Sequence, residues 1–321
     1  MSAYLKQGLH GVLVGEVESG KSHQYVTAYN LRFVMPDGSD FYPFRPAVVI
    51  VTGSDRSSAA GTAGDMVTAD DCRFVKVADV DSARHLMRRE VPLGINGQPF
   101  RMVVLDSWSS FRDQAAAEAR HRLVTEGERG KSVAGQIQKN PAYNSKEIHR
   151  QAQPDVVGLF QEFLEVSAAS PRLMISTCHT RGKYTTEGTR IGEEPVLYDS
   201  MVTPFRASAN FVWHMRKVLP RTTGMSAETI NQRHAQGLLK PSFVAYTTAM
   251  HYPEIGELSH CKCQGSGSMA VFANLPPVWT DPNLGFVLAY TVARQHGFDI
   301  TPCDEHGNPT DQTPDHYRVN N

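Results

Sequence analysis

The sequence predicts an α/β fold: a mainly parallel sheet with helices on both faces, followed by a small irregular C-terminal extension. Short apolar runs rich in β-branched residues recur along residues 1–220, and stretches with helical character separate most of them. A glycine-rich loop joins the first run to the first helical stretch. Strands that alternate with helices form parallel sheets covered by helices. After residue 220, glycine, proline and polar residues become more frequent, which indicates an extension at residues 221–321.

The first apolar run, residues 10–14 (HGVLV), leads into an unbroken G-x-x-x-x-G-K-S motif. This motif is typical of a phosphate-binding loop (P-loop), because its glycines let successive N–H groups point at a polyphosphate. We expect Lys21 to reach the β- and γ-phosphates of ATP and Ser22 to bind Mg²⁺. A chance match in a glycine-rich turn is the alternative. The residues expected to contact ATP are Gly15, Glu16, Val17, Glu18, Ser19, Gly20, Lys21, Ser22 and His23.

The stretch after the loop, residues 21–34, contains no proline or glycine and predicts a helix whose N-terminus faces the phosphates. Further strands are predicted at residues 47–52, 74–77, 102–106, 173–177 and 210–215. Helices are predicted at 81–90, 110–125, 155–169 and near 285–296. A loop with prolines and aromatic residues (35–46) and a polar insertion (about 126–154) interrupt the pattern. Residues 1–220 are therefore expected to form the nucleotide-binding core.

Asp106 follows four apolar residues at the end of the predicted strand 102–106. A P-loop enzyme needs an acid that orients the water shell of Mg²⁺, and this acid normally ends a buried neighbouring strand. We expect Asp106 to take this role together with Ser22. An aspartate that caps the following helix is the alternative. Two predicted strands separate the P-loop from Asp106 in the sequence, which places an additional strand between the two motif strands.

With these motifs, the chain resembles phage-encoded P-loop proteins of the RecA-like class, among them the phage single-strand-annealing and recombination ATPases. The resemblance covers about residues 8–218 and rests on GEVESGKS (15–22), VVLDSWSSF (103–111) and STCHT (176–180). It implies a RecA-like fold and an ATPase of phage DNA recombination or replication, with ATP between subunits of a ring or filament. It also implies single-stranded DNA as a partner, other phage recombination or replication proteins, and the cytoplasm of an infected bacterial host.

The resemblance also suggests roles for individual residues. A polar side chain after the next strand senses the γ-phosphate in this class, and here that residue is His179; a packed histidine is the alternative. The catalytic carboxylate, usually a glutamate, follows the strand after the P-loop helix, where this sequence has the shorter Asp55. Slow hydrolysis is therefore expected. The candidates for an arginine finger that reaches a neighbour's γ-phosphate are Arg181, Lys183, Arg216 and Lys217.

The formal net charge of −1 provides no global basic field, so DNA binding requires a local basic patch. In the segment 112–150, Lys131 with its neighbours Gly130 and Ser132 could follow a phosphate backbone, and Tyr143 could stack on a base. A solvated helical insertion explains this segment equally well, because acidic residues are interspersed. Its basic residues are Arg112, Arg120, Arg122, Arg129, Lys131, Lys139, Lys146 and Arg150.

The five cysteines, an odd number, indicate a reducing cytosol rather than a disulfide framework. Cys261, Cys263, Cys303 and His306 would make a Cys₃His set for a structural Zn²⁺. The C-x-C spacing is tighter than usual, and free cysteines are the alternative. The sequence has no long apolar stretch, so no membrane partner is expected.

The leading hypothesis is an ATPase that acts on single-stranded DNA, with Lys21, Asp55, Asp106 and His179 as its catalytic residues. A helicase-like or DNA-packaging motor is a second hypothesis. A nucleotide-binding assembly protein with little turnover is a third, which the acidic P-loop and Asp55 keep open. A small-molecule kinase fits less well, because of the additional strand and the polar strand end.

Overall fold

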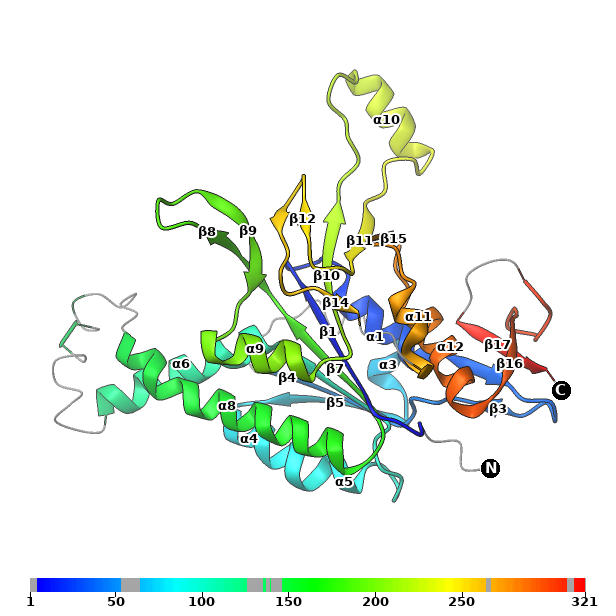
Figure 1. The fold of residues 1–321 in the computed structure, drawn as a ribbon, viewed down its shortest axis with the longest axis horizontal. Helices are drawn as coiled ribbons and strands as arrows, with labels where there is room; N and C mark the ends of the chain where they lie inside the picture. Colours follow the sequence, from blue (N-terminus) through cyan, green and yellow to red (C-terminus); the bar gives the residue numbers. More distant parts are fainter. Residues whose placement is uncertain are drawn as a thin grey trace. The chain divides into compact units, whose positions relative to one another are not determined.

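The computed structural model describes residues 5–52, 64–125, 146–263, 267–310 and 315–320, and also residues 135, 136 and 139. The chain divides into two compact units. The first contains residues 1–11, 42–178 and 196–209, and the second contains residues 12–41, 179–195 and 210–321. Figure 1 labels the helices and strands.

The first unit contains strands in the order β1-β7-β6-β4-β5. Residues 9–11 of β1 (Leu9–Gly15) belong to this unit, and the rest of the strand belongs to the second unit. β4 (Ala47–Thr52) pairs in parallel with β5 (Cys72–Val77) and with β6 (Met102–Asp106), and β6 pairs in parallel with β7 (Leu173–Cys178). Every residue of β4, β6 and β7 is buried. Strands buried on both faces have continuous apolar sequences, which is why these runs predict them.

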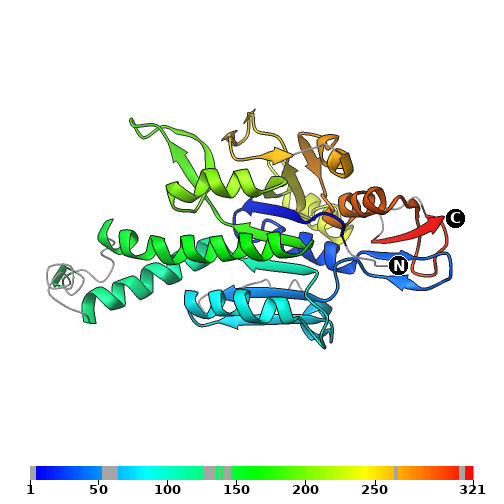
Figure 2. The same ribbon diagram turned by 60° about the horizontal axis from the view of Figure 1, so that its bottom comes forward.

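The helices of the first unit are α3 (Asp65–Thr68), α4 (Val80–His85), α5 (Val91–Leu93), α6 (Trp108–Thr125), α8 (Lys146–Ala169) and α9 (Asp199–Ser208). A π-helical turn (Leu86–Glu90) joins α4 to α5. α6 and α8 pack side by side (Figure 2). At this contact the ring of Trp108 meets Phe160 and Phe163 edge-on. α8 begins nine residues before the predicted start at 155, so the end of the polar insertion is helical.

The second unit contains strands in the order β15-β11-β10-β1, and β14 also pairs with β10. β10 (Phe211–Val218) is antiparallel to β11 (Ser242–Tyr246) and to β14 (Lys262–Cys263). β15 (Val278–Thr280) is antiparallel to β11. The structure thus confirms an α/β fold with a mixed sheet of mostly parallel strands and helices.

Two small sheets complete the strands of the second unit. The first has the order β12 (His251–Tyr252), β13 (Gly256–Glu257), β9 (Arg190–Pro195), β8 (Thr180–Tyr184). The second has the order β16 (Asp299–Pro302), β17 (His316–Asn320), β2 (Arg32–Val34), β3 (Asp40–Phe41). β2 replaces the last turn of the predicted helix 21–34. The helix ends earlier because Phe33 packs against Phe41, Phe298 and Tyr317.

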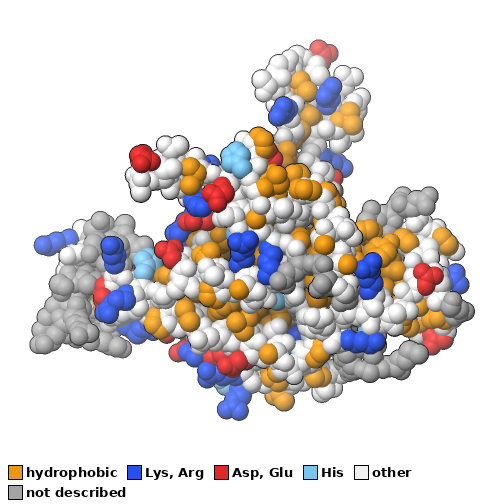
Figure 3. Space-filling model, in the orientation of Figure 1, with side chains coloured by type: hydrophobic (Ala, Val, Ile, Leu, Met, Phe, Trp, Pro, Cys, Tyr) orange, Lys and Arg blue, Asp and Glu red, His pale blue; other side chains and the backbone are white. Residues whose placement is uncertain are grey.

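The helices of the second unit are α1 (Lys21–Asn30), α10 (Ala227–Ala235), α11 (Ala270–Ala273), which follows a 3₁₀ turn (Gly267–Met269), and α12 (Leu284–His296). α1 packs against α12. α10 has no buried residue, and it stands away from the sheet in the connection between β10 and β11 (Figures 1 and 3). In the described part of the chain, no helix combines the length and the apolar character needed to cross a bilayer.

The structure divides the chain differently from the predicted boundary at residue 220. Residues after 220 provide β11 and β15 of the main sheet, α12 against α1, and β17, which pairs in parallel with β2. The tail therefore belongs to the same unit as the P-loop. The sequence predicted α12 as the helix near 285–296, but it predicted none of the described strands after residue 220, each of which is only two to five residues long.

Candidate functional site

The P-loop backbone uses glycine at two positions where a side chain does not fit. A Cβ atom on Gly15 would lie 2.2 Å from the carbonyl oxygen of Met215 on β10. Gly20 has a φ of 88°, and a Cβ atom there would lie 2.9 Å from the Phe243 ring on β11. Both ends of the loop thus rest closely against neighbouring strands. The two glycines of the motif are explained by this close approach and by the left-handed backbone at Gly20.

Lys21 is buried at the first position of α1, and its ammonium turns back into the loop. The Nζ atom donates to the carbonyl oxygens of Gly15 (2.9 Å) and Glu16 (2.5 Å), and it lies 3.3 Å from Ser19 Oγ. A lysine ammonium held inside a glycine loop at a helix N-terminus is suited to bind a polyphosphate, since both the charge and the helix dipole favour anions. Ser22 and His23 follow in the first turn of α1.

Asp106 belongs to the first unit, where it is buried at the end of β6. The Thr177 hydroxyl on β7 donates to the Asp106 carboxylate. The peptide bond between Asp106 and Ser107 is cis. Ser107 Oγ accepts a hydrogen bond from the Ser110 N–H at 3.3 Å, so this serine satisfies a backbone donor at the start of α6. Asp106 is a buried carboxylate, oriented by a hydroxyl, and its oxygens are of the kind that Mg²⁺ prefers.

No protein-family model matches this chain, and no curated protein matches it.

The remaining residues predicted for catalysis lie in different places. His179 directly follows β7 and is counted with the second unit, where it is half-buried. Asp55 lies outside the described residues. The loop residues 15–23 lie together in the second unit, whereas Asp106 and Thr177 lie together in the first. The sequence indicated a polar side chain at the end of β7, and the structure shows that Thr177 on this strand donates a hydrogen bond to the carboxylate.

Many of the basic side chains predicted to bind nucleic acid or a neighbour's phosphate have an acidic partner. Their nitrogen–oxygen distances are between 2.7 and 3.2 Å. Such pairing reduces the local positive charge that a phosphate backbone would meet. Lys131, Arg129 and Tyr143 lie outside the described residues. The ion pairs are Arg122–Asp155, Arg150–Glu147, Arg181–Glu194, Lys183–Glu257 and Lys217–Glu18.

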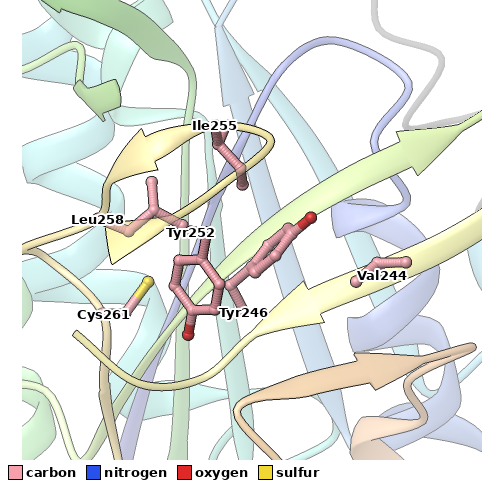
Figure 4. Packing of buried hydrophobic residues seen from close by; sticks show 6 residues of the cluster. All are labelled: Val244, Tyr246, Tyr252, Ile255, Leu258 and Cys261. Atoms are coloured by element: carbon pink, nitrogen blue, oxygen red, sulfur yellow. The ribbon is translucent and has the colours of Figure 1, made fainter. Parts of the chain in front are cut away.

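The predicted Cys₃His set is not gathered into a zinc site. Among the described residues, which include all four of the set, no group of three or more His, Cys, Asp or Glu side chains could hold a metal ion. Cys261 packs in a hydrophobic cluster with Tyr246 and Tyr252 (Figure 4), and Cys303 is buried beside β16. Burial raises the pKa of Cys263 to about 11, which disfavours the thiolate that binds metals. His306 is exposed in a turn.

A buried chain of three ionisable side chains was missed by the sequence analysis. The Glu193 carboxylate on β9 lies 3.2 Å from His214 Nε2 on β10, and His214 Nδ1 lies 3.2 Å from His260 Nε2. Arg190 also donates to Glu193, at 2.7 Å. Burial acts to raise the pKa of Glu193, but the hydrogen bond and charge of His214, with the charges of Arg190 and Arg216, lower it overall. The sequence gives one signal of this chain, the histidine His214 inside an apolar strand, and this signal does not indicate which residues it contacts.

Proposed function

We propose that this chain is a RecA-like P-loop ATPase, which binds Mg-ATP and acts on single-stranded DNA in phage recombination or replication. The observation that carries the proposal is the P-loop at residues 15–22. Its two motif glycines stand where no side chain fits, and the buried Lys21 ammonium points into the loop. Few sites other than nucleotide-binding loops need this combination of close backbone approach, an inward lysine and a helix N-terminus.

The strand order of the first unit supports the RecA-like branch. In that branch an additional strand separates the P-loop strand from the strand that carries the magnesium-binding acid. Here β7 lies between β1 and β6. The separating strand follows Asp106 in the chain, so it is not one of the two strands that precede Asp106 in the sequence.

The roles of the residues follow from their chemistry. Lys21 and the loop N–H groups would hold the phosphates, and Ser22 and Asp106 are the residues proposed to hold Mg²⁺. A bound Mg²⁺ would supply positive charge that offsets the negative charge of the phosphates. Thr177 orients the Asp106 carboxylate by donating a hydrogen bond to it. In this proposal Asp55 positions the attacking water and His179 senses the γ-phosphate, within a ring or filament of identical chains in the cytoplasm of an infected bacterial host.

The proposal is tested by measuring ATP binding and hydrolysis with and without single-stranded DNA. Lys21→Ala is compared with Lys240→Ala, which removes the same charge from an exposed position of the same unit. We expect Lys21→Ala to weaken ATP binding roughly 10- to 100-fold, because a hydrogen bond from a charged group contributes about 1.5–3 kcal/mol. Turnover should rise with DNA and be lost in Lys21→Ala alone. Equal ATP binding and turnover in the wild-type and Lys21→Ala proteins would reject the assignment.

The acidic P-loop favours a second candidate function, a nucleotide-binding assembly protein with little turnover. Glu18 lies in the loop with a φ of 60°, and its side chain is two-thirds exposed. A carboxylate beside the phosphates opposes the negative charge that ATP brings. Tight ATP binding without hydrolysis, with or without DNA, together with ATP-dependent assembly in light scattering, would favour this candidate over the first.

A further inference from the structure

An ion pair joins the P-loop to the end of β10. Lys217 Nζ lies 3.1 Å from Glu18 Oε2. The lysine side chain is 34% exposed and the glutamate side chain 66%. The pair therefore lies at the surface beside the loop, and an exposed ion pair of this kind contributes little to stability because water and salt screen it. The pair is of interest because it places the Lys217 ammonium beside the P-loop.

The backbone around the P-loop fixes Lys217 close to it. The start of the loop touches the Met215 carbonyl, two residues before Lys217 on β10. The end of the loop touches the Phe243 ring, and Phe243 is the residue that pairs with Lys217 across β10 and β11. Both ends of the loop are thus packed against the two strands that carry Lys217 and its cross-strand neighbour. The lysine is held beside the loop by rigid elements rather than by the ion pair alone.

A polyphosphate in the loop would change the charge that Lys217 faces. The loop N–H groups and Lys21 would hold the phosphates only a few residues from Glu18, whose carboxylate repels them. A lysine ammonium forms charge-assisted hydrogen bonds to phosphate oxygens as well as to carboxylates, and a polyphosphate carries more negative charge than the single Glu18 carboxylate. Four methylene groups give Lys217 the reach to exchange one partner for the other, without a change in the strand.

We propose that Lys217 is a phosphate-binding residue of the P-loop in its own chain, and that Glu18 competes with the nucleotide for it. This inference rests on the proposed nucleotide-binding function. It assigns Lys217 to the same chain's nucleotide, in contrast to an arginine finger that serves a neighbour. It also gives Glu18 a specific effect: this carboxylate lowers the affinity for ATP by holding the lysine and by repelling the phosphates.

The test is the dissociation constant of Mg-ATP, measured by titration calorimetry at one fixed salt concentration. Lys217→Ala should weaken binding about 10-fold, and Lys217→Arg should stay within about 2-fold of wild type, since arginine also binds phosphate. Glu18→Gln should tighten binding several-fold. Lys240→Ala and Asp40→Asn are the controls, since each removes one charge of the same sign from an exposed position of the same unit. Thermal unfolding verifies that every variant is folded.

The outcomes separate this inference from the proposed function. If Lys21→Ala loses ATP binding while Lys217→Ala binds ATP as tightly as wild type, Lys217 is not a phosphate ligand and only the inference fails. If Lys217→Ala and Glu18→Gln both weaken binding to the same extent, the pair serves the shape of the loop, and the inference also fails. If the wild-type chain binds no ATP, the proposed function and the inference fail together.

Discussion

Glu193 is buried between a cationic side chain and a histidine. Its carboxylate accepts from Arg190 at 2.7 Å and lies 3.2 Å from His214 Nε2. His214 in turn contacts His260 through its other ring nitrogen. A buried charge is tolerated only when its hydrogen bonds are made, so this chain links β9, β10 and the segment that precedes β14. Removal of the Glu193 carboxylate takes one hydrogen-bond partner from the buried His214 ring.

We predict that Glu193→Gln lowers the free energy of unfolding at pH 7 by about 1.5–3 kcal/mol, the usual contribution of a hydrogen bond to a charged group. The pKa of Glu193 is lowered in the folded state, so its stabilising contribution is complete above its ordinary pKa of 4.5 and is lost as the pH falls through the lower folded value. The wild-type protein should therefore lose more stability than Glu193→Gln as the pH falls below about 4.5. Urea unfolding at several pH values measures both effects.

Glu187→Gln is the control for this prediction. The pKa of Glu187 is also lowered, by hydrogen bonds from Thr185 and Thr186, but its side chain is fully exposed in the turn between β8 and β9. We expect no measurable loss of stability in this variant. A Glu193→Gln protein with the stability and acid sensitivity of the wild type would contradict the role given to the buried chain.

Among the elements, the contact between α1 and α12 determines where the P-loop helix lies in its unit. The buried Gln24 amide donates to the Pro282 carbonyl at 2.9 Å, and its oxygen accepts from the Leu284 N–H at 3.0 Å. The Gly285 N–H donates to Thr27 Oγ1 at 3.1 Å. A Cβ atom on Gly285 would lie 2.5 Å from the Thr27 carbonyl oxygen, so glycine permits the close approach of the two helices.

Gln24→Ala should lower the free energy of unfolding by about 2–4 kcal/mol, because it leaves a buried carbonyl and a buried N–H without partners. Because α1 begins directly after the loop, the affinity for ATP should fall as well. The control is Gln232→Ala on the exposed face of α10, for which no loss is expected. Equal denaturant midpoints for the two variants would show that the α1–α12 contact does not depend on Gln24.

The elements also mark what the sequence can predict. β4, β6 and β7 are buried on both faces, so their apolar runs predicted them to within a residue or two. The need for glycine at positions 15 and 20 was predictable because the motif depends on local backbone geometry, whereas phosphate binding by this loop stays a prediction. The Glu193–His214–His260 chain was not, because its members come from separate segments and no local pattern joins them. The ion pair of Lys217 with Glu18 was not predictable for the same reason, since the two residues are far apart in the sequence. β2 was predicted as the end of a helix, because the packing of Phe33 against Phe41 is a tertiary contact that the sequence does not show.

At the scale of the whole molecule, the residues after 220 are needed by the unit that carries the P-loop. Without them, β10 loses its antiparallel neighbours β11 and β14, and α1 loses α12. The buried side chains of Trp213 and Phe211, which pack on Phe272, would then face water. The cost of exposing two such aromatic side chains is about 3–6 kcal/mol, a large part of the stability of an ordinary domain.

A chain that ends at residue 220 should therefore lack a cooperative thermal transition and should not bind ATP. Circular dichroism on heating and titration calorimetry measure these properties. The control is deletion of α10, with residues 222–238 replaced by a short glycine–serine loop, since α10 has no buried residue. That variant should keep its cooperative transition. If the 1–220 fragment folds and binds ATP, the residues after 220 form a separate extension, as the sequence predicted.

The parallel pairing of β17 with β2 has a consequence for how the protein is made. His316 pairs with Arg32, so the partner strand leaves the ribosome about 280 residues after β2, and a long loop must close before the pair can form. Until then β2 and β3 form only a two-stranded ribbon, which is marginally stable alone. During synthesis the helix that follows the P-loop is therefore connected to an unfinished sheet, with the edge of β2 open to any other extended chain. This sheet is therefore completed late in biosynthesis. Slower translation would lengthen the period in which the open edge of β2 can pair with a strand of another newly made copy.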